Sequence, residues 1–161
     1  MTRISRLFST LKQNNQKGLI AYLTAGDPSP ERTPALAEAL ERGGADLIEL
    51  GVPFSDPIAD GPVIQRATER ALAAGVTLTS VLGMLKTLRP SIAAPIVIFS
   101  YANPILRMGL ASLVIAAKAA GVDGVRPRDL PPVHGAQPPA ASSAPGRDTR
   151  QCRGERTHRH D

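Results

Sequence analysis

The sequence contains a single cysteine, Cys152, so no disulfide can form within the chain. Such a pattern is compatible with a reducing compartment, and we expect a cytoplasmic location. No apolar run approaches the roughly 18 to 20 residues that cross a bilayer, which argues against a membrane protein. No G-x-G-x-x-G motif follows an apolar run, so a dinucleotide-binding sheet loses support.

The overall composition is typical of a globular domain. Of the 161 residues, 42% are hydrophobic and 20% are charged, which is enough for one domain with a real core. Residues 1–18 lack acids and contain Arg and Ser, as an organelle transit peptide would. Ile4, Leu7, Phe8 and Leu11 have helical spacing, however, and we favour an amphipathic helix that packs on the domain.

The composition changes near residue 125. Residues 126–161 hold six of the 15 prolines and have Leu130 and Val133 as their only large aliphatic residues. So little apolar surface cannot offset the entropy that folding would cost. We therefore expect an ordered domain over residues 1–125 and a disordered C-terminal tail over residues 126–161.

Two features of this tail could suggest function. Its seven arginines could bind nucleic acid, but the tail has no Phe, Tyr or Trp on which bases could stack, so we expect no nucleic-acid partner. Cys152, His158, His160 and Asp161 could ligate a metal ion, but their spacing matches no closed zinc pattern. We expect no metal site.

Short apolar runs alternate with helical patterns along the ordered part. Strands are predicted at 18–24, 45–50, 94–102 and 122–125, and helices at 30–44, 62–75, 79–88 and 109–121. Pro30 would open the first of these helices, and Thr79 would be the N-cap of the third. The alternation predicts βαβ units and a parallel sheet, and hence an α/β fold. A doubly wound open sheet and a (β/α) barrel both fit, and four units are half of such a barrel.

Two acids stand out in residues 48–62, which read IELGVPFSDPIADGP. Strand alternation puts Glu49 with Leu47 on one face and Ile48 with Leu50 on the other. A glutamate that faces a barrel interior at the carboxyl end of a strand is partly desolvated, which favours its neutral form and suits a general acid/base. Asp60, in the following loop, could bind a substrate N–H or stabilise a positive charge. From the residues alone, a solvated loop is an equally good interpretation.

The same stretch resembles the signature of the tryptophan synthase alpha subunit family. TAGDPSPE, AAGVT, SYANPI and AGVDGV then follow in the family's order, and the resemblance covers residues 1–125. It implies a (β/α)8 TIM barrel, of which this chain has about four βα units. It also implies a lyase of tryptophan biosynthesis, which cleaves indole-3-glycerol phosphate to indole and glyceraldehyde 3-phosphate.

The resemblance also assigns roles to residues. Glu49 would be the general acid/base, and Asp60 would hold the indole N–H. The indole pocket would be lined by Tyr22, Thr24, Leu50 and Tyr101. No metal or organic cofactor is implied for this subunit, because pyridoxal phosphate belongs to the beta subunit, its partner in an alpha2-beta2 tetramer. The surface that meets the beta subunit would include Asp56, Pro57 and Asn103.

The chain departs from the family after GVDGV. Arg126, Pro127 and Arg128 replace the apolar strand of the family, and beyond Val133 the resemblance ends. The composition there is typical of GC-rich coding DNA read out of frame, which predicts frameshifts near codons 126 and 134. The later loops, which commonly bind phosphate in such barrels, would be absent. We therefore expect this truncated chain to be inactive, with a non-catalytic binder of the beta subunit or a non-functional gene remnant as alternatives.

Overall fold

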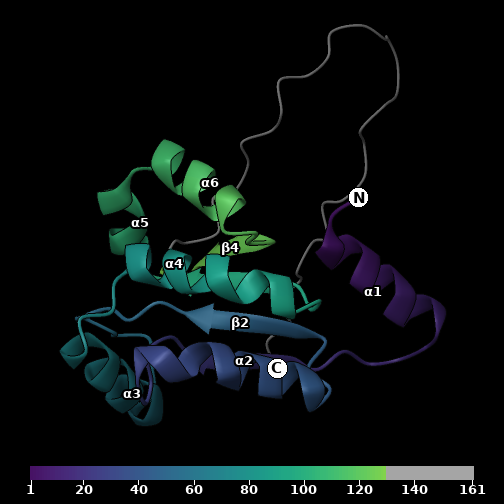
Figure 1. The fold of residues 1–161 in the computed structure, drawn as a ribbon, viewed down its shortest axis with the longest axis horizontal. Coiled ribbons are helices and arrows are strands. Elements are labelled where there is room, and N and C mark those ends of the chain that lie inside the picture. The colour runs from purple at the N-terminus through teal and green to yellow at the C-terminus, as the bar shows by residue number, and fades with distance from the viewer. Residues whose placement is uncertain (130–161) are drawn as a thin grey trace, which may run out of the picture. The chain divides into compact units, whose positions relative to one another are not determined.

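A parallel sheet organises the computed structural model, which describes residues 1–129 (Figure 1). Its strands are β1 (Ile20–Thr24), β2 (Leu47–Gly51), β3 (Ile96–Ser100) and β4 (Gly124–Pro127). They pair in the order β1-β2-β3-β4, and every pair is parallel. The predicted α/β class and the strand–helix alternation are confirmed.

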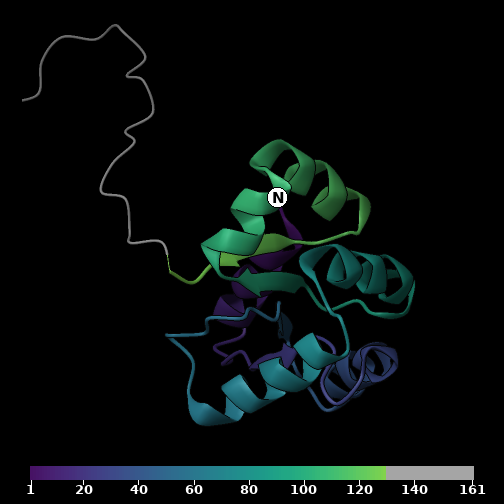
Figure 2. The same ribbon diagram turned by 90° about the vertical axis from the view of Figure 1, so that its left-hand side faces the viewer.

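Helices connect the strands and cover one face of the sheet, as Figure 2 shows for α2, α4 and α6. The α-helices are α1 (Arg3–Gln13), α2 (Thr33–Arg42), α3 (Pro62–Ala73), α4 (Leu78–Leu88), α5 (Ala102–Met108) and α6 (Leu110–Ala119). Two short 3-10 helices, η1 (Pro30–Arg32) and η2 (Arg89–Ser91), precede α2 and follow α4.

The main core lies between this sheet face and the helices. Its strand residues Ile48, Leu50, Ile96 and Ile98 are each at most 1% exposed. They meet apolar residues of the helices, among them Ala37, Val81, Leu85, Leu113 and Ala117. Because burying one such side chain stabilises by roughly 1.5–3 kcal/mol, this layer supplies much of the stability of the unit. The predicted alternation in β2, with Ile48 and Leu50 on one face, is confirmed.

Helix α1 packs at the amino ends of the strands. Ile4 lies near the start of β4, where a Cβ atom added at Gly124 would be 3.4 Å from its Cδ1, and Arg3 pairs with Asp123 at 3.1 Å. The Asp123 carboxylate also accepts a hydrogen bond from Arg89 at 3.2 Å. The amphipathic helix predicted near the N-terminus is therefore present and packs on the domain.

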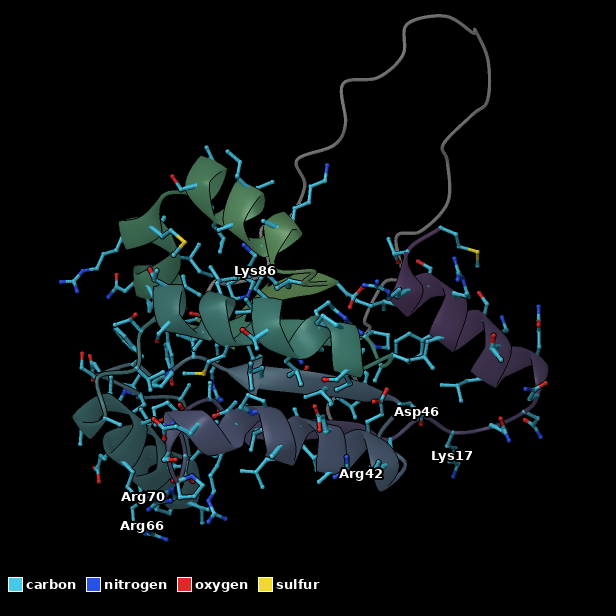
Figure 3. All side chains as sticks on the ribbon, in the orientation of Figure 1. Lys17, Arg42, Asp46, Arg66, Arg70 and Lys86 are labelled. Carbon is cyan, nitrogen blue, oxygen red and sulfur yellow. The ribbon has the colours of Figure 1, made fainter. Side chains whose placement is uncertain are left out.

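Arg70 and Asp27 form a well-ordered ion pair on the outer surface. Arg70 of α3, labelled in Figure 3, donates two hydrogen bonds to the Asp27 carboxylate, at 2.6 and 3.0 Å. A bidentate pair of this kind fixes geometry better than a single contact does. It ties the loop after β1 to α3, close to the carboxyl ends of the strands.

Some predicted boundaries are wrong. The N-cap of α4 is Thr77 and not Thr79: the Thr77 hydroxyl accepts a hydrogen bond from the Ser80 N–H at 3.3 Å, and the Thr77 N–H donates to Ser80 Oγ at 2.8 Å. This reciprocal capping box satisfies two N–H groups, which a cap at Thr79 would leave open. Pro30 begins a 3-10 turn, and the α-helix itself begins at Thr33.

The fourth strand extends to Pro127, two residues past the predicted domain boundary at 125. Backbone hydrogen bonds form the strand whatever the side chains, so Arg126 does not interrupt it. The division of the chain at residue 125 stays a prediction. The predicted disordered tail and the Cys152, His158, His160 and Asp161 cluster lie outside the described residues, apart from residues 126–129.

Within residues 1–129, no helix on its own has both the length and the apolar character to cross a membrane. One pair, Pro62–Ala73 with Leu78–Ser91, meets the length and composition test jointly, but it is bent by 91°. The same part of the chain has no group of three or more His, Cys, Asp or Glu residues placed to hold a metal ion.

Candidate active site

The two acids singled out in the sequence lie at the carboxyl ends of the strands. Glu49 is on the face of β2 that points away from the helices, and its side chain is 17% exposed. Asp60 lies in the loop between β2 and α3, and its side chain is 6% exposed. The strand register aligns Glu49 with Tyr22 on β1 and with Val97 on β3. This face therefore has a carboxylate flanked by an aromatic and an aliphatic side chain.

Aromatic rings form the wall of this face. Tyr22 and Phe99 meet edge to face, with ring centroids 5.9 Å apart, and Phe54 and Tyr101 lie 5.0 Å apart. Gly51 makes room for the first pair, since a Cβ atom there would lie 2.1 Å from the Tyr22 hydroxyl oxygen. The arrangement depends on the absence of a side chain at position 51.

We therefore expect Gly51→Ala to destabilise the domain by about 1–3 kcal/mol, because the added methyl group displaces Tyr22. Urea denaturation measures the change in the free energy of unfolding. The matched control is Gly83→Ala, inside α4, where nothing lies within 4 Å of the new Cβ. Alanine is the better helix former, so this control should be neutral or slightly stabilising. Equal effects at the two positions would contradict the steric role of Gly51.

The tyrosines hold protons that they can donate. The Tyr101 hydroxyl donates to Asp60 Oδ2 at 3.1 Å and accepts from the Ala59 N–H at 3.0 Å. Burial raises the pKa of Tyr101. The hydrogen bond from the Ala59 N–H lowers this pKa, and the Asp60 carboxylate raises it further. Burial also raises the pKa of Tyr22, whose oxygen accepts a weak hydrogen bond from the Thr24 hydroxyl at 3.4 Å. Both phenols are neutral at pH 7, and Tyr101 orients the Asp60 carboxylate.

Arginines from the end of β4 occupy the same face. Arg126 pairs with Glu49, with 3.1 Å between Nη1 and Oε1, and Arg128 pairs with Asp60. Their guanidinium carbons lie 5.4 and 5.2 Å from the centroid of the Phe99 ring, within the range of cation–π attraction. Arg128 also donates to the carbonyl oxygen of Ala59. Each candidate catalytic carboxylate thus has an arginine counter-ion.

Most of the predicted pocket residues come together at this end of the sheet, but Leu50 does not. Tyr22, Thr24 and Tyr101 lie around Glu49 and Asp60. Leu50 is 1% exposed and lies in the core between the sheet and the helices, on the opposite face from Glu49. Its assignment to the indole pocket is wrong, because adjacent residues of a strand point to opposite faces.

The predicted partner surface lies at the same end. Asp56 is exposed and Pro57 is half-buried, and both lie in the loop after β2. Asn103 is exposed and lies in the first turn of α5. The Tyr101 hydroxyl joins these two segments through Ala59 and Asp60. One conformation of the loop thus sets both the position of Asp60 and the shape of this surface.

Four residues of the site were missed from the sequence: Phe54, Phe99, Arg126 and Arg128. Alternation along β3 and β4 was the available signal, because Phe99 pairs with Gly51 and Arg126 in the strand register. Applied to both strands, it would have put Phe99 and Arg126 on the face of Glu49.

Comparison with known proteins identifies the family of this chain. The family model described as "Tryptophan synthase alpha chain" matches residues 8–144. The chain belongs to the tryptophan synthase alpha chain family. The alpha chain of Solibacter usitatus is 65% identical over 124 residues, which are 77% of this chain and 46% of the relative. That of Cupriavidus taiwanensis is 59% identical over 133 residues, which are 82% of this chain and 50% of the relative.

Solved structures of the family agree with the fold. The tryptophan synthase subunit alpha of Legionella pneumophila superimposes with a TM-score of 0.80 at 47% identity, over 82% of this chain and 51% of that one. The described residues are thus about four strand–helix units of a TIM barrel. The chain spans about half the length of the curated tryptophan synthase alpha chains that it matches.

Proposed function

We propose that residues 1–125 supply the acid–base half of a lyase site that cleaves indole-3-glycerol phosphate in tryptophan biosynthesis. The observation that supports this is the placement of Glu49 and Asp60 at one end of the sheet, beside Tyr22, Phe99 and Tyr101. Flat aromatic side chains suit an indole ring, and two carboxylates suit a reaction in which protons move and positive charge develops.

In the proposed reaction, Glu49 protonates C3 of the indole, and the ring becomes a cation. Asp60 accepts a hydrogen bond from the ring N–H and stabilises that charge. Glu49, now a carboxylate, takes the proton of the glycerol hydroxyl, and a carbonyl group forms at that carbon. The carbon–carbon bond to the indole breaks, and the electron pair of this bond returns to the ring. The products are indole and glyceraldehyde 3-phosphate, and the proton balance closes without a cofactor. We propose that this subunit uses no metal or organic cofactor and acts in the cytoplasm.

We also propose that the chain as it stands does not turn over substrate. Arg126 and Arg128 pair with both carboxylates and lie over Phe99, where the indole ring would stack. Arginine remains charged at any pH at which proteins are stable. The two arginine side chains therefore compete with the substrate for both carboxylates and for the Phe99 ring at every such pH.

Two chimeras test these proposals together. The first joins residues 1–125 of this chain to the remainder of the Solibacter usitatus alpha chain, and the second keeps residues 1–129, with Arg126 and Arg128. We expect the first to release indole from indole-3-glycerol phosphate at a rate near that of the parent. The second should be at least about 100-fold slower, because one misplaced group in a catalytic site has effects of this size. An inactive first chimera would overturn the proposed function, and two equally active chimeras would overturn the role of the arginines.

The tryptophan synthase beta subunit, with its pyridoxal phosphate, is the proposed partner in an alpha2-beta2 assembly. One observation favours a second function, a non-catalytic binder of that subunit: Asp56 and Asn103 stay exposed, and the ion pairs of Arg126 and Arg128 are with Glu49 and Asp60 instead. Co-purification of the chain with a beta subunit, combined with an assay of indole release, separates the cases. Binding without activity supports the second function, and neither binding nor activity supports a non-functional gene remnant.

A further inference from the structure

Tyr22 carries a hydroxyl group that has no part in the reaction proposed above. The residue lies on β1 beside Glu49 of β2 in the strand register, and its ring meets Phe99 edge to face. A Cβ atom at Gly51 would lie 2.1 Å from the hydroxyl oxygen. Because residues 49 and 51 of one strand point to the same face, this oxygen lies past Glu49, toward the loop that carries Asp60.

The hydroxyl proton of Tyr22 is not used by the described part of the chain. Within residues 1–129, the hydroxyl has a single hydrogen bond, which its oxygen accepts from Thr24 Oγ1 at 3.4 Å. Tyr22 is half-buried and Thr24 is 6% exposed, so bulk water has limited access to the phenol. A buried polar group normally has a partner. A substrate oxygen that contacts Glu49 lies on the same face and is placed to be that partner.

The surroundings keep the phenol in the form that donates. Burial raises the pKa of Tyr22, and the hydrogen bond from Thr24 lowers it. Of the nearby charges, the Asp60 and Glu49 carboxylates raise this pKa and Arg128 lowers it. The phenol therefore stays protonated at any pH at which the two carboxylates act. The influence of both carboxylates agrees with the position of the hydroxyl between them.

We propose that Tyr22 is a catalytic residue that donates a hydrogen bond to the glycerol oxygen next to the bond that breaks. This inference rests on the proposed lyase function. When Glu49 takes the proton of that hydroxyl, negative charge develops on the oxygen until the carbonyl group forms. The Tyr22 phenol stabilises this charge and keeps its own proton, so the proton balance is unchanged. Thr24 strengthens the donor, because it donates to the same phenol oxygen.

Tyr22→Phe tests the proposal in the chimera that joins residues 1–125 to the remainder of the Solibacter usitatus alpha chain. We expect kcat for indole release to fall about 10- to 100-fold, the effect of losing one hydrogen bond to a developing charge. KM should rise at most about threefold, because the oxygen is uncharged in the bound substrate. Phenylalanine keeps the ring that meets Phe99, so the same substitution in the full chain should leave the circular dichroism spectrum unchanged.

Indole-3-propanol phosphate identifies the atom that the hydroxyl contacts. This analogue has the indole ring and the phosphate but no hydroxyl group on its propyl chain. Isothermal titration calorimetry should give Kd values within about twofold for the chimera and its Tyr22→Phe variant, because the analogue lacks the proposed acceptor. Binding that is about 10-fold weaker in the variant would mean that the hydroxyl acts on the ring or on Asp60, and it would overturn the proposal.

The unaltered chimera separates failure of this proposal from failure of the proposed function. An inactive unaltered chimera would overturn both. An active chimera whose Tyr22→Phe variant keeps more than about a third of its kcat would overturn the role of Tyr22 alone. Thr87→Val is the matched control, because it removes an exposed hydroxyl group from α4, whose partner is the carbonyl oxygen of Gly83. It should keep full activity.

Discussion

Glu49→Gln in the chimera that joins at residue 125 is expected to lower kcat for indole release by a factor of about 100 to 10,000, the range for loss of a general acid/base. Glutamine has nearly the size of glutamate, so the fold should be unchanged. It can neither give nor take the proton at C3 of the indole. KM should change little, because Glu49 acts on the reacting atoms and not on the phosphate end of the substrate.

Steady-state assays of indole formation measure this effect. Glu31→Gln is the control, since Glu31 is an exposed carboxylate in the 3-10 turn Pro30–Arg32 and lies outside strand β2, which carries Glu49. It should retain full activity. A Glu49→Gln chimera within threefold of its parent would show that another group moves the proton.

Arg128→Met is expected to destabilise the chain by roughly 2–4 kcal/mol. Asp60 is 6% exposed, so removal of its counter-ion leaves a buried carboxylate whose charge is not compensated. The loss falls somewhat below the roughly 3–5 kcal/mol of a fully buried pair, because the Arg128 side chain is 23% exposed. The double variant Arg128→Met/Asp60→Asn should recover at least about half of the loss, since asparagine carries no charge and can still accept the hydrogen bond of Tyr101.

Urea denaturation of Arg128→Met, the double variant and the unaltered chain measures the free energies of unfolding. Arg126→Met provides the comparison, because the Arg126 side chain is 65% exposed and its pair with Glu49 is largely solvated. Its effect should not exceed about 1 kcal/mol. Equal losses for Arg126→Met and Arg128→Met would mean that burial of Asp60 does not set the energy of its pair.

The fold was largely predictable because its signals are local. The apolar runs that became β1 to β4 and the helical spacing of the segments between them lie within short windows of sequence. Helix α5 was missed because it is seven residues long and follows β3 with one residue between them, so that the apolar run of the strand continued into it. The cap at Thr77 depends on a pair of hydrogen bonds with Ser80, and the prediction of Thr79 took no account of them.

The site was less predictable because its contacts are long-range. Glu49 and Arg126 are separated by 77 residues in the sequence, and Asp60 and Tyr101 by 41. Strand alternation specifies the face of each side chain but not its partner across the sheet. Leu50 shows the opposite error, because an assignment by resemblance overrode an alternation that had placed this residue correctly.

The chain has no tryptophan, and Tyr22 and Tyr101 are its only tyrosines. Both lie in the candidate site, one against Phe99 and the other against Asp60. Near-ultraviolet absorbance and fluorescence of the unlabelled polypeptide therefore report on this one region without a background from elsewhere. An alkaline spectrophotometric titration should show phenolate appearing above the ordinary range for tyrosine, since the pKa of each group is raised by burial. Ligands, partners and substitutions near β4 can thus be followed with a spectrophotometer alone.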